Sequence, residues 1–234
     1  MFHFKKFSID DSSAAMKIGT DSVLLGAWTA CEHETRILDI GTGSGILALM
    51  MAQRNKSIPV DAVELEPEAA CLANINVQMS PWPHQVKVFN TSIQDYYVES
   101  PHKYSLVISN PPFFTDSLKT PGKARTMARH NDTLPVDVLL KITSGVLKEN
   151  GKAAFIIAAD AFGNWTREAS NLFLFPSLIT RVKSSVNHLP LRILVVFTRE
   201  KKYVAPDNDL FIYSSKNIYS NEYRELTKAF YLNF

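Results

Sequence analysis

The segment Asn110-Pro111-Pro112-Phe113 combines residues that could carry out chemistry on a planar amine. Consecutive prolines hold the backbone extended and remove two amide donors, which leaves the Asn110 side-chain oxygen and the Pro111 carbonyl as acceptors. Both can accept the hydrogens of one amino group and direct its delocalised lone pair toward an electrophile. Phe113 offers a flat face on which the ring can stack. The segment predicts group transfer to a ring-bound amino nitrogen; the alternative is a stiff turn without a catalytic role.

A second segment, Asp39-Ile40-Gly41-Thr42-Gly43-Ser44-Gly45, has the composition of a ligand-binding loop. Glycines let the backbone turn sharply and let a ligand approach without a Cβ in the way. Their spacing is G-x-G-x-G, not the G-x-G-x-x-G of dinucleotide folds. Asp39, directly before the glycines, would repel a pyrophosphate but suits a ligand that carries an amino group. These features favour S-adenosylmethionine over NAD as the cofactor.

Glu64 is placed to bind the ribose of such a cofactor. It lies at the end of an apolar run, residues 60–65, roughly twenty residues after the glycines, where an acid can accept hydrogen bonds from both ribose hydroxyls. The alternative is a solvated loop carboxylate, which is our interpretation of Glu66 and Glu68.

Alternating strands and helices place these motifs in space. Apolar runs predict seven strands, over residues 36–40, 60–65, 85–89, 104–109, 152–159, 178–185 and 193–199. Helix formers predict helices over residues 46–54, 67–79 and 136–147. The alternation predicts an α/β, Rossmann-like class I fold: a mostly parallel seven-stranded sheet, helices on both faces and an antiparallel edge strand. The motifs then follow the carboxyl ends of strands, where such sheets bind ligands.

We predict one domain, residues 1–234, in which residues 1–33 form an N-terminal lid over substrate and cofactor together with a helix, and residues 34–234 form a Rossmann-like core that ends in a helix. Two interpretations of residues 16–28 remain open. An apolar helical face around Val23 to Trp28 could pack on the sheet, with Thr20 or Asp21 as its cap. Alternatively, Lys17, Thr20 and Asp21 could cover the cofactor as a lid.

Composition excludes several classes of protein. The chain has 234 residues, of which 46% are hydrophobic and 21% charged, the balance of a soluble globular protein. Residues 1–10 lack the apolar region of a secretory signal, and no apolar run approaches the roughly 20 residues that span a bilayer. Cys31 and Cys71 form neither a metal spacing nor a disulfide framework, so we expect two reduced, packed thiols. We expect a cytoplasmic monomer without a metal or a membrane partner.

Local charge indicates an RNA partner, although the net charge of +2 is too small to do so. Residues 117–130 contain several cations and no acid, beside the Asn-Pro-Pro-Phe segment where a phosphate backbone would pass. The candidate RNA contacts are Lys5, Lys6, Lys119, Lys123, Arg125, Arg129 and His130. The alternative is a solvated basic loop.

The ordered set of Asp39 to Gly45, Glu64 and Asn110 to Phe113 resembles the class I S-adenosylmethionine-dependent methyltransferases that modify amino groups. Phe4 to Phe7, Met16 to Trp28, Ala128 to His130 and the tail, Ala229 to Leu232, are similar to the bacterial tRNA(Val) adenine-N6 methyltransferases. This resemblance covers nearly the whole chain. It implies methyl transfer to N6 of the unpaired adenine 3′ of the anticodon.

The resemblance also implies roles for individual residues. Asp39, Gly41 and Gly43 would line the methionine part of the cofactor, while Asn110, Pro111 and Phe113 would hold the target adenine. The cofactor contacts that we expect are Lys17, Thr20, Asp39, Gly41, Gly43, Gly45, Glu64, Leu65, Ser92, Ile93 and Asn110; the catalytic residues are Asn110, Pro111, Pro112 and Phe113.

Two residues depart from the pattern of the resembled enzymes. Where they usually carry an acid after the third strand, this chain has Ser92 and Ile93, so a hydroxyl or a backbone amide would contact the cofactor adenine. Phe113 replaces the more frequent tyrosine and keeps the stacking face.

Other functions remain open from the sequence. Asn-Pro-Pro-aromatic segments also serve methylation of protein glutamine amides, and an amino group of an rRNA base is a further candidate substrate. A module that binds the cofactor or RNA without transferring a methyl group is the third alternative.

Overall fold

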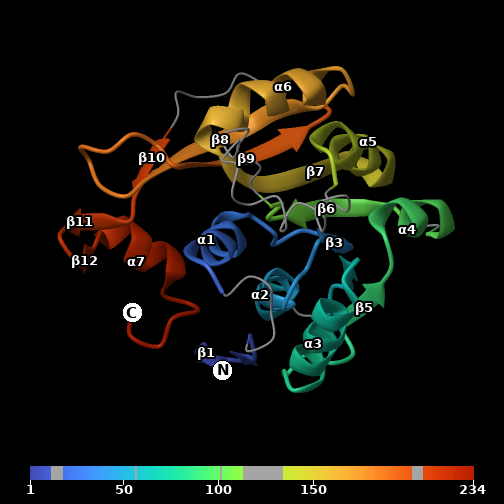
Figure 1. The fold of residues 1–234 in the computed structure, drawn as a ribbon, viewed down its shortest axis with the longest axis horizontal. Helices are drawn as coiled ribbons and strands as arrows, with labels where there is room; N and C mark the ends of the chain where they lie inside the picture. The colour runs from blue at the N-terminus through green and yellow to red at the C-terminus, as the bar shows by residue number, and fades with distance from the viewer. Residues whose placement is uncertain (12–17, 56, 101, 113–133, 202–207) are drawn as a thin grey trace, which may run out of the picture.

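The centre of the structure is a twisted sheet with helices on both faces (Figure 1). The computed structural model describes residues 1–11, 18–55, 57–100, 102–112, 134–201 and 208–234. Within these ranges the sheet has eight strands: β3 (Ile37–Ile40), β4 (Val60–Glu64), β5 (Val86–Asn90), β6 (Tyr104–Ser109), β7 (Leu147–Ala158), β8 (Phe175–Lys183), β9 (Arg192–Thr198) and β10 (Asn208–Phe211). The helices are α1 (Thr20–Trp28), α2 (Ile46–Arg54), α3 (Pro67–Gln78), α4 (Ile93–Glu99), α5 (Val136–Val146), α6 (Phe162–Ser170) and α7 (Asn221–Thr227).

The strand order is β10-β8-β9-β7-β6-β3-β4-β5, and β9 runs antiparallel to both of its neighbours. The predicted fold class is therefore confirmed, with an antiparallel pair toward one edge. Two details differ: β10 adds an eighth strand, and β9 lies between β7 and β8 instead of at the edge. The short connection after β8 forces β9 to run antiparallel. Because β9 is almost wholly buried and β8 is only partly buried, the inner position suits β9.

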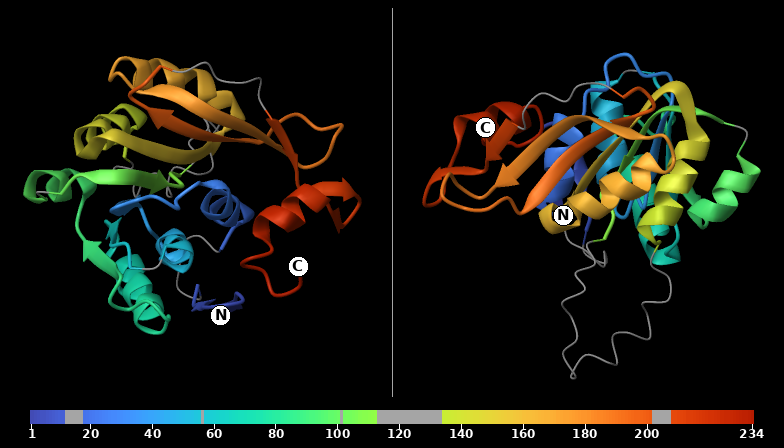
Figure 2. Two further views of the ribbon diagram at one scale, coloured as in Figure 1. Left: turned by 180° about the vertical axis from the view of Figure 1, so that it is seen from behind. Right: turned by 90° about the horizontal axis from the view of Figure 1, so that it is seen from above.

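Alternate residues of the strands feed two cores, one on each face of the sheet. Ile37 joins the core that contains α1 and α2, whereas the next residue, Leu38, joins the core that contains α5 and α6. Figure 2 shows the same division, with α4, α5 and α6 on one side of the sheet and α1, α2 and α7 on the other. The loops that follow the parallel strands β3, β4, β5 and β6 therefore lie along a single edge of the sheet.

The ends of the chain pack on the first of these cores. β1 (Phe2–His3) and β2 (Ser8–Ile9) form a hairpin, and its Phe4 stacks on Phe7 and on Tyr231 of the tail. The predicted helix near the end of the chain is present as α7, and β11 (Tyr213–Ser215) and β12 (Ile218–Tyr219) precede it. The division of the chain at residue 33 remains a prediction.

Two further observations concern the class of protein. Cys31 is buried, whereas Cys71 is exposed on α3, so the expectation that both thiols pack inside is wrong for Cys71. In the described ranges, no helix has the length and apolar composition required to cross a bilayer.

A buried polar cluster ties together the amino ends of three strands. Asp61 of β4 accepts hydrogen bonds from the Arg36 guanidinium, at 2.8 and 3.1 Å, and from the Tyr104 hydroxyl, at 2.7 Å. The hydroxyl of Tyr96 lies 2.6 Å from that of Tyr104. Because burial raises the pKa of Tyr104, its hydroxyl keeps the proton that it donates to Asp61. This cluster lies at the edge of the sheet opposite the motifs.

Candidate active site at the carboxyl edge of the sheet

The glycine loop connects β3 to α2 and adopts a conformation that requires glycine. The φ angles of Gly41, Gly43 and Gly45 are +69°, +57° and +85°, all in the left-handed region. A Cβ built on Gly41 or Gly43 would meet no atom within 4 Å, whereas one on Gly45 would meet Ala73 of α3 at 3.5 Å. Gly45 thus packs against a helix, and the first two glycines face open space that leaves room for a ligand.

Asp39, the last but one residue of β3, braces this loop from inside. Its side chain is fully buried, and Oδ2 accepts hydrogen bonds from the Thr42 hydroxyl (2.5 Å) and the Ala48 amide (3.1 Å). Oδ1 has no hydrogen-bond partner among the described residues. Loss of solvation raises the pKa of Asp39 to about 7; the two hydrogen bonds oppose this shift, and the nearby Glu64 carboxylate adds to it.

The raised pKa of Asp39 predicts a pH dependence of stability. Since an unfolded aspartate ionises near 3.8, the folded protein binds more protons than the unfolded chain between this pH and about 7. The free energy of unfolding therefore falls as pH rises through this window, by at most about 1.4 kcal/mol per pH unit. Asp39→Asn keeps the shape and removes the titration. Its stability relative to the wild type, from urea unfolding, should increase from pH 5 to pH 7 and then level off. Parallel pH profiles for the two proteins would contradict the prediction.

Glu64 joins the glycine loop to the end of β4. Its carboxylate accepts hydrogen bonds from the Gly43 amide (2.8 Å) and from the Glu66 amide (3.0 Å), one on each oxygen. Each oxygen keeps a second lone pair. Asn90, which sequence reasoning missed, donates to the carbonyls of Glu64 and Leu65, both at 3.0 Å. The Glu64 carboxylate is thus held beside the open glycines, and Leu65 is exposed next to it.

Ser92 and Ile93 lie where β5 leads into α4. The Ser92 hydroxyl caps the helix: it accepts a hydrogen bond from the Asp95 amide at 3.0 Å and donates to the Asp95 carboxylate at 2.6 Å. Of the two contacts expected for the cofactor adenine, the hydroxyl is therefore already used. Amides in the first turn of a helix have no partner within that helix, which favours the Ile93 amide as the donor.

Asn110 follows β6, next to the end of β3. Ser109 fixes this junction, because its hydroxyl donates to the Ile40 carbonyl at 2.7 Å. Asn110 Nδ2 donates to the Ser22 hydroxyl at 2.9 Å, while Asn110 Oδ1 is buried without a partner among the described residues. This orphaned acceptor is the atom that the motif assigns to an amino group. Pro111 is half-buried, Pro112 is exposed, and Phe113 lies outside the described residues.

The N-terminal segment reaches this junction through α1. The packing interpretation is confirmed, since Val23 to Ala27 are buried. The predicted cap is wrong: Gly19 occupies the N-cap position, and Asp21 instead forms an ion pair with Arg192 of β9 at 2.8 Å. Thr20 is exposed at the first turn, and Lys17 lies outside the described residues. Sequence reasoning missed Ser22, because its contact with Asn110 joins positions 88 residues apart.

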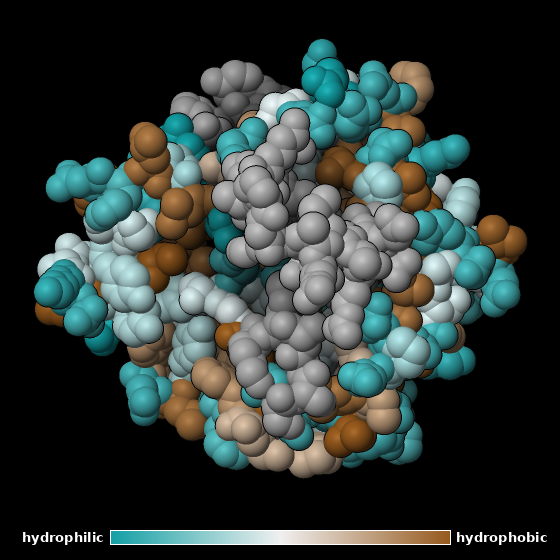
Figure 3. All heavy atoms as spheres, in the orientation of Figure 1, coloured by the Kyte–Doolittle hydropathy of each residue, from teal (hydrophilic) through white to brown (hydrophobic). Residues whose placement is uncertain are grey.

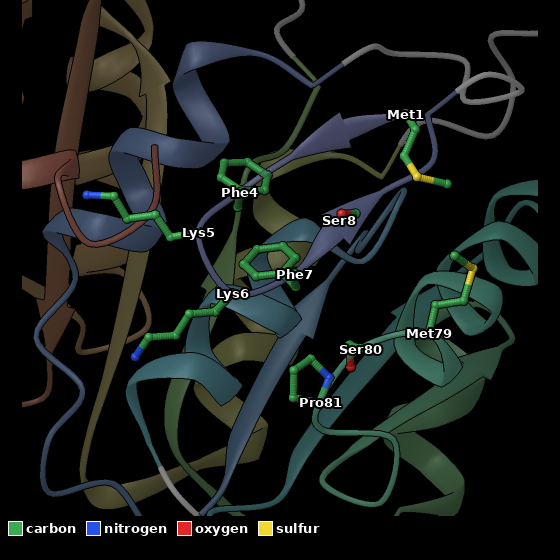
Figure 4. Close-up of a pocket in the computed structure, with 9 residues that line it drawn as sticks. All are labelled: Met1, Phe4, Lys5, Lys6, Phe7, Ser8, Met79, Ser80 and Pro81. Carbon is green, nitrogen blue, oxygen red and sulfur yellow. The ribbon is translucent and has the colours of Figure 1, made fainter. Parts of the chain in front are cut away.

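The candidate RNA contacts divide into two groups. Five of them, Lys119, Lys123, Arg125, Arg129 and His130, lie outside the described residues. Lys5 and Lys6 border a shallow pocket of about 590 Å³ between the N-terminal hairpin and the end of α3 (Figure 4). The face of the molecule that Figure 3 shows carries both hydrophilic and hydrophobic residues.

The structure shows a structural role for Lys5, whose expected RNA contact stays a prediction. Its ammonium donates to the carbonyls of Lys228 and Phe234, both at 2.7 Å, so it holds the tail of the chain. The tail contacts the last turn of α2, where the Gln53 side chain donates a hydrogen bond to the Ala229 carbonyl. The glycine loop, in contrast, precedes the first turn of α2. α2 has nine residues, about 13 Å of helix. Lys5 is thus occupied by the tail, and the tail contacts the end of α2 opposite to the glycine loop.

Comparisons with known proteins indicate the family and the fold of this chain. Residues 12–135 match the family described as methyltransferase small domain. A tRNA1(Val) (adenine(37)-N6)-methyltransferase of Flavobacterium psychrophilum is 39% identical over 233 residues, which cover 99% of each chain. The protein of the same name in Bacteroides fragilis is 43% identical over 232 residues, which cover 99% of this chain and 97% of the relative. A predicted O-methyltransferase of Agrobacterium tumefaciens has a TM-score of 0.70 over 90% of this chain and 96% of its own, at 16% identity, a likeness of fold alone.

Proposed function

Because this chain belongs to the family of tRNA1(Val) (adenine(37)-N6)-methyltransferases, we propose that it methylates N6 of adenine 37 in that tRNA, with S-adenosylmethionine as the methyl donor. The observation that carries the proposal is the buried Oδ1 of Asn110, which has no partner among the described residues and lies beside the open glycine loop. Buried acceptors are rarely left without a hydrogen bond, so this one fits a donor that arrives with the substrate.

The residues around the loop fit the cofactor. Gly41 and Gly43 leave space for its methionine part, and Glu64 has lone pairs left for two ribose hydroxyls. Oδ1 of Asp39, which also has no hydrogen-bond partner in the described ranges, gives this end of the site an acidic group that suits an ammonium. S-adenosylmethionine, when bound, supplies an electrophilic methyl group on a sulfonium sulfur.

The chain's own residues then activate the amine. Asn110 Oδ1 and the Pro111 carbonyl accept hydrogen bonds from the two N–H groups of the adenine amino group. These bonds turn the lone pair of the nitrogen out of conjugation with the ring and toward the methyl group. The nitrogen becomes positively charged as its bond to the methyl carbon forms and the sulfur–carbon bond breaks. It afterwards loses a proton to water, so no strong base is needed. We assign Phe113 to stacking against the adenine ring.

We also propose which residues contact the rest of the RNA. Lys119, Lys123, Arg125 and Arg129 follow the catalytic segment in sequence, and cations at this place suit the phosphates of an anticodon loop. An unpaired adenine spares the enzyme the few kcal/mol required to open a duplex. We further propose that the protein acts as a monomer in the cytoplasm, where its tRNA substrate is found.

The test is transfer of labelled methyl groups from S-adenosylmethionine to unmodified tRNA1(Val), followed by nucleoside mass spectrometry. We expect N6-methyladenosine, and no label when adenine 37 is replaced by guanine. Labelling of rRNA or of a glutamine-containing protein in place of tRNA would contradict the substrate assignment. Cofactor binding without transfer to any of these would contradict the enzymatic role.

A further inference from the structure

The amide of Asn110 has two ends of nearly equal shape and opposite hydrogen-bonding character. Its oxygen can accept an N–H of the substrate, whereas its NH₂ group would meet that N–H as a second donor. A rotation of 180° about the last side-chain bond would therefore replace an acceptor by a donor at the reacting nitrogen. The proposed chemistry requires that this rotation is prevented.

Within the described part of the chain, one hydrogen bond restrains this amide group. Asn110 Nδ2 donates to Ser22 Oγ at 2.9 Å, and Oδ1 faces the other way, buried and without a partner among the described residues. The reversed amide would leave an NH₂ group with two donors in the place of Oδ1. Since the Ser22 hydroxyl could also donate to a reversed amide, the bond alone does not select the orientation. The orientation is favoured by the burial of Oδ1, where two N–H donors would find no acceptor among the described residues, and the bond to Ser22 restrains the amide group.

Ser22 is itself held firmly, because α1 is fixed near both ends. At its first turn, Asp21 pairs with Arg192 of β9 at 2.8 Å. At its last turn, Arg54 of α2 donates to the carbonyls of Gly26, Ala27 and Thr29 at 2.7 to 2.9 Å.

Close packing adds to these bonds. Gly26 lies so near α2 that an added Cβ would meet the Met50 sulfur at 2.6 Å. Residues Val23 to Ala27 are buried. The Ser22 hydroxyl is consequently part of a rigid support and not of a movable cover.

We infer that Ser22 is a positioning residue, which restrains the Asn110 amide group while the amide oxygen faces the substrate amino group. The inference rests on the proposed function and extends it to the N-terminal segment: α1 aligns the catalytic acceptor. Ser22 acts through Asn110, and no direct contact with the substrate is required of it.

Three variants test the role of Ser22 in full-length protein. Ser22→Ala should lower kcat for methylation of tRNA1(Val) about 10- to 100-fold, the cost of a misaligned catalytic group. The KM for tRNA and the Kd for S-adenosylmethionine should change less than about threefold, because binding contacts remain. Ser22→Thr keeps the hydroxyl and should recover most of the rate. Ser170→Ala, a matched loss of a hydroxyl on the distant helix α6, should leave the rate unchanged.

A second measurement needs no RNA. The side-chain amide signals of Asn110 in a ¹H–¹⁵N spectrum, identified by their absence in Asn110→Ala, should shift in Ser22→Ala and stay in place in Ser170→Ala. Unshifted signals, or a Ser22→Ala rate within about twofold of wild type, would overturn the inference. Failure of the wild type to methylate tRNA would instead overturn the proposed function, and the spectrum would still report on the Ser22 bond.

Discussion

Replacement of Asn110 by alanine is expected to lower the rate of methyl transfer about 100- to 1,000-fold, the usual effect of losing one preorganised hydrogen-bonding group at a reacting centre. The variant removes the buried acceptor Oδ1 and leaves the Pro111 carbonyl alone on the amino group. The lone pair of the adenine nitrogen then stays conjugated with its ring. The cofactor should still bind, because Asp39, Glu64 and the glycine loop lie on β3 and β4.

The measurement is single-turnover transfer from labelled cofactor to tRNA1(Val), with cofactor affinity determined by calorimetry on the same preparations. Asn164→Ala, on the exposed side of α6, is the matched control and should transfer at the wild-type rate. If Asn110→Ala keeps more than about a tenth of the wild-type rate, the assignment of the acceptor pair is wrong. If it also loses the cofactor, Asn110 contributes to cofactor binding.

The backbone of the site could be predicted from the sequence because its signals are local. The helix Ile46–Arg54 and the strand Tyr104–Ser109 match the prediction residue for residue, since glycines or prolines bound the apolar runs. The same signals placed the glycine loop, Glu64 and Asn110 along one edge of a parallel sheet.

Short elements with mixed composition escaped prediction. α4 has seven residues, and its start is marked by Ser92 and Asp95, a capping pair that the sequence analysis interpreted as a cofactor contact at Ser92. β10 begins with Asn208 and Asp209 and owes its strand conformation to pairing with β8. Tertiary pairing decided both its presence and its place at the edge.

Side-chain contacts across the chain were the least predictable feature. Ser22 and Asn110 are 88 positions apart, and Lys5 is more than 200 positions from the tail residues that it contacts. Hydrophobic periodicity identifies the buried side of an element but not the partner of a polar side chain. The sequence therefore located the catalytic acceptor without indicating what orients it.

Replacement of Asp61 by alanine is expected to have the largest effect on stability. Its carboxylate is almost fully buried and binds both the Arg36 guanidinium and the Tyr104 hydroxyl. Alanine would leave a cation and a hydroxyl without an acceptor between β3, β4 and β6. Removing one partner of a buried ion pair typically costs 3–5 kcal/mol, and we expect about 3 kcal/mol because Arg36 is 25% exposed and can reach water.

Urea unfolding followed by circular dichroism gives the free energy of unfolding for comparison with the wild type. The control is Glu225→Ala, which removes an ion pair with Lys228 whose side chains are 70% and 57% exposed; its cost should stay below about 0.5 kcal/mol. If Asp61→Ala lowers the free energy of unfolding by no more than this control does, Arg36 and Tyr104 find other partners in the variant. Because Asp61 lies at the amino ends of the strands, folded Asp61→Ala protein should retain cofactor affinity. A loss of affinity in folded protein would show that strain passes along β4 from Asp61 to Glu64, three residues away.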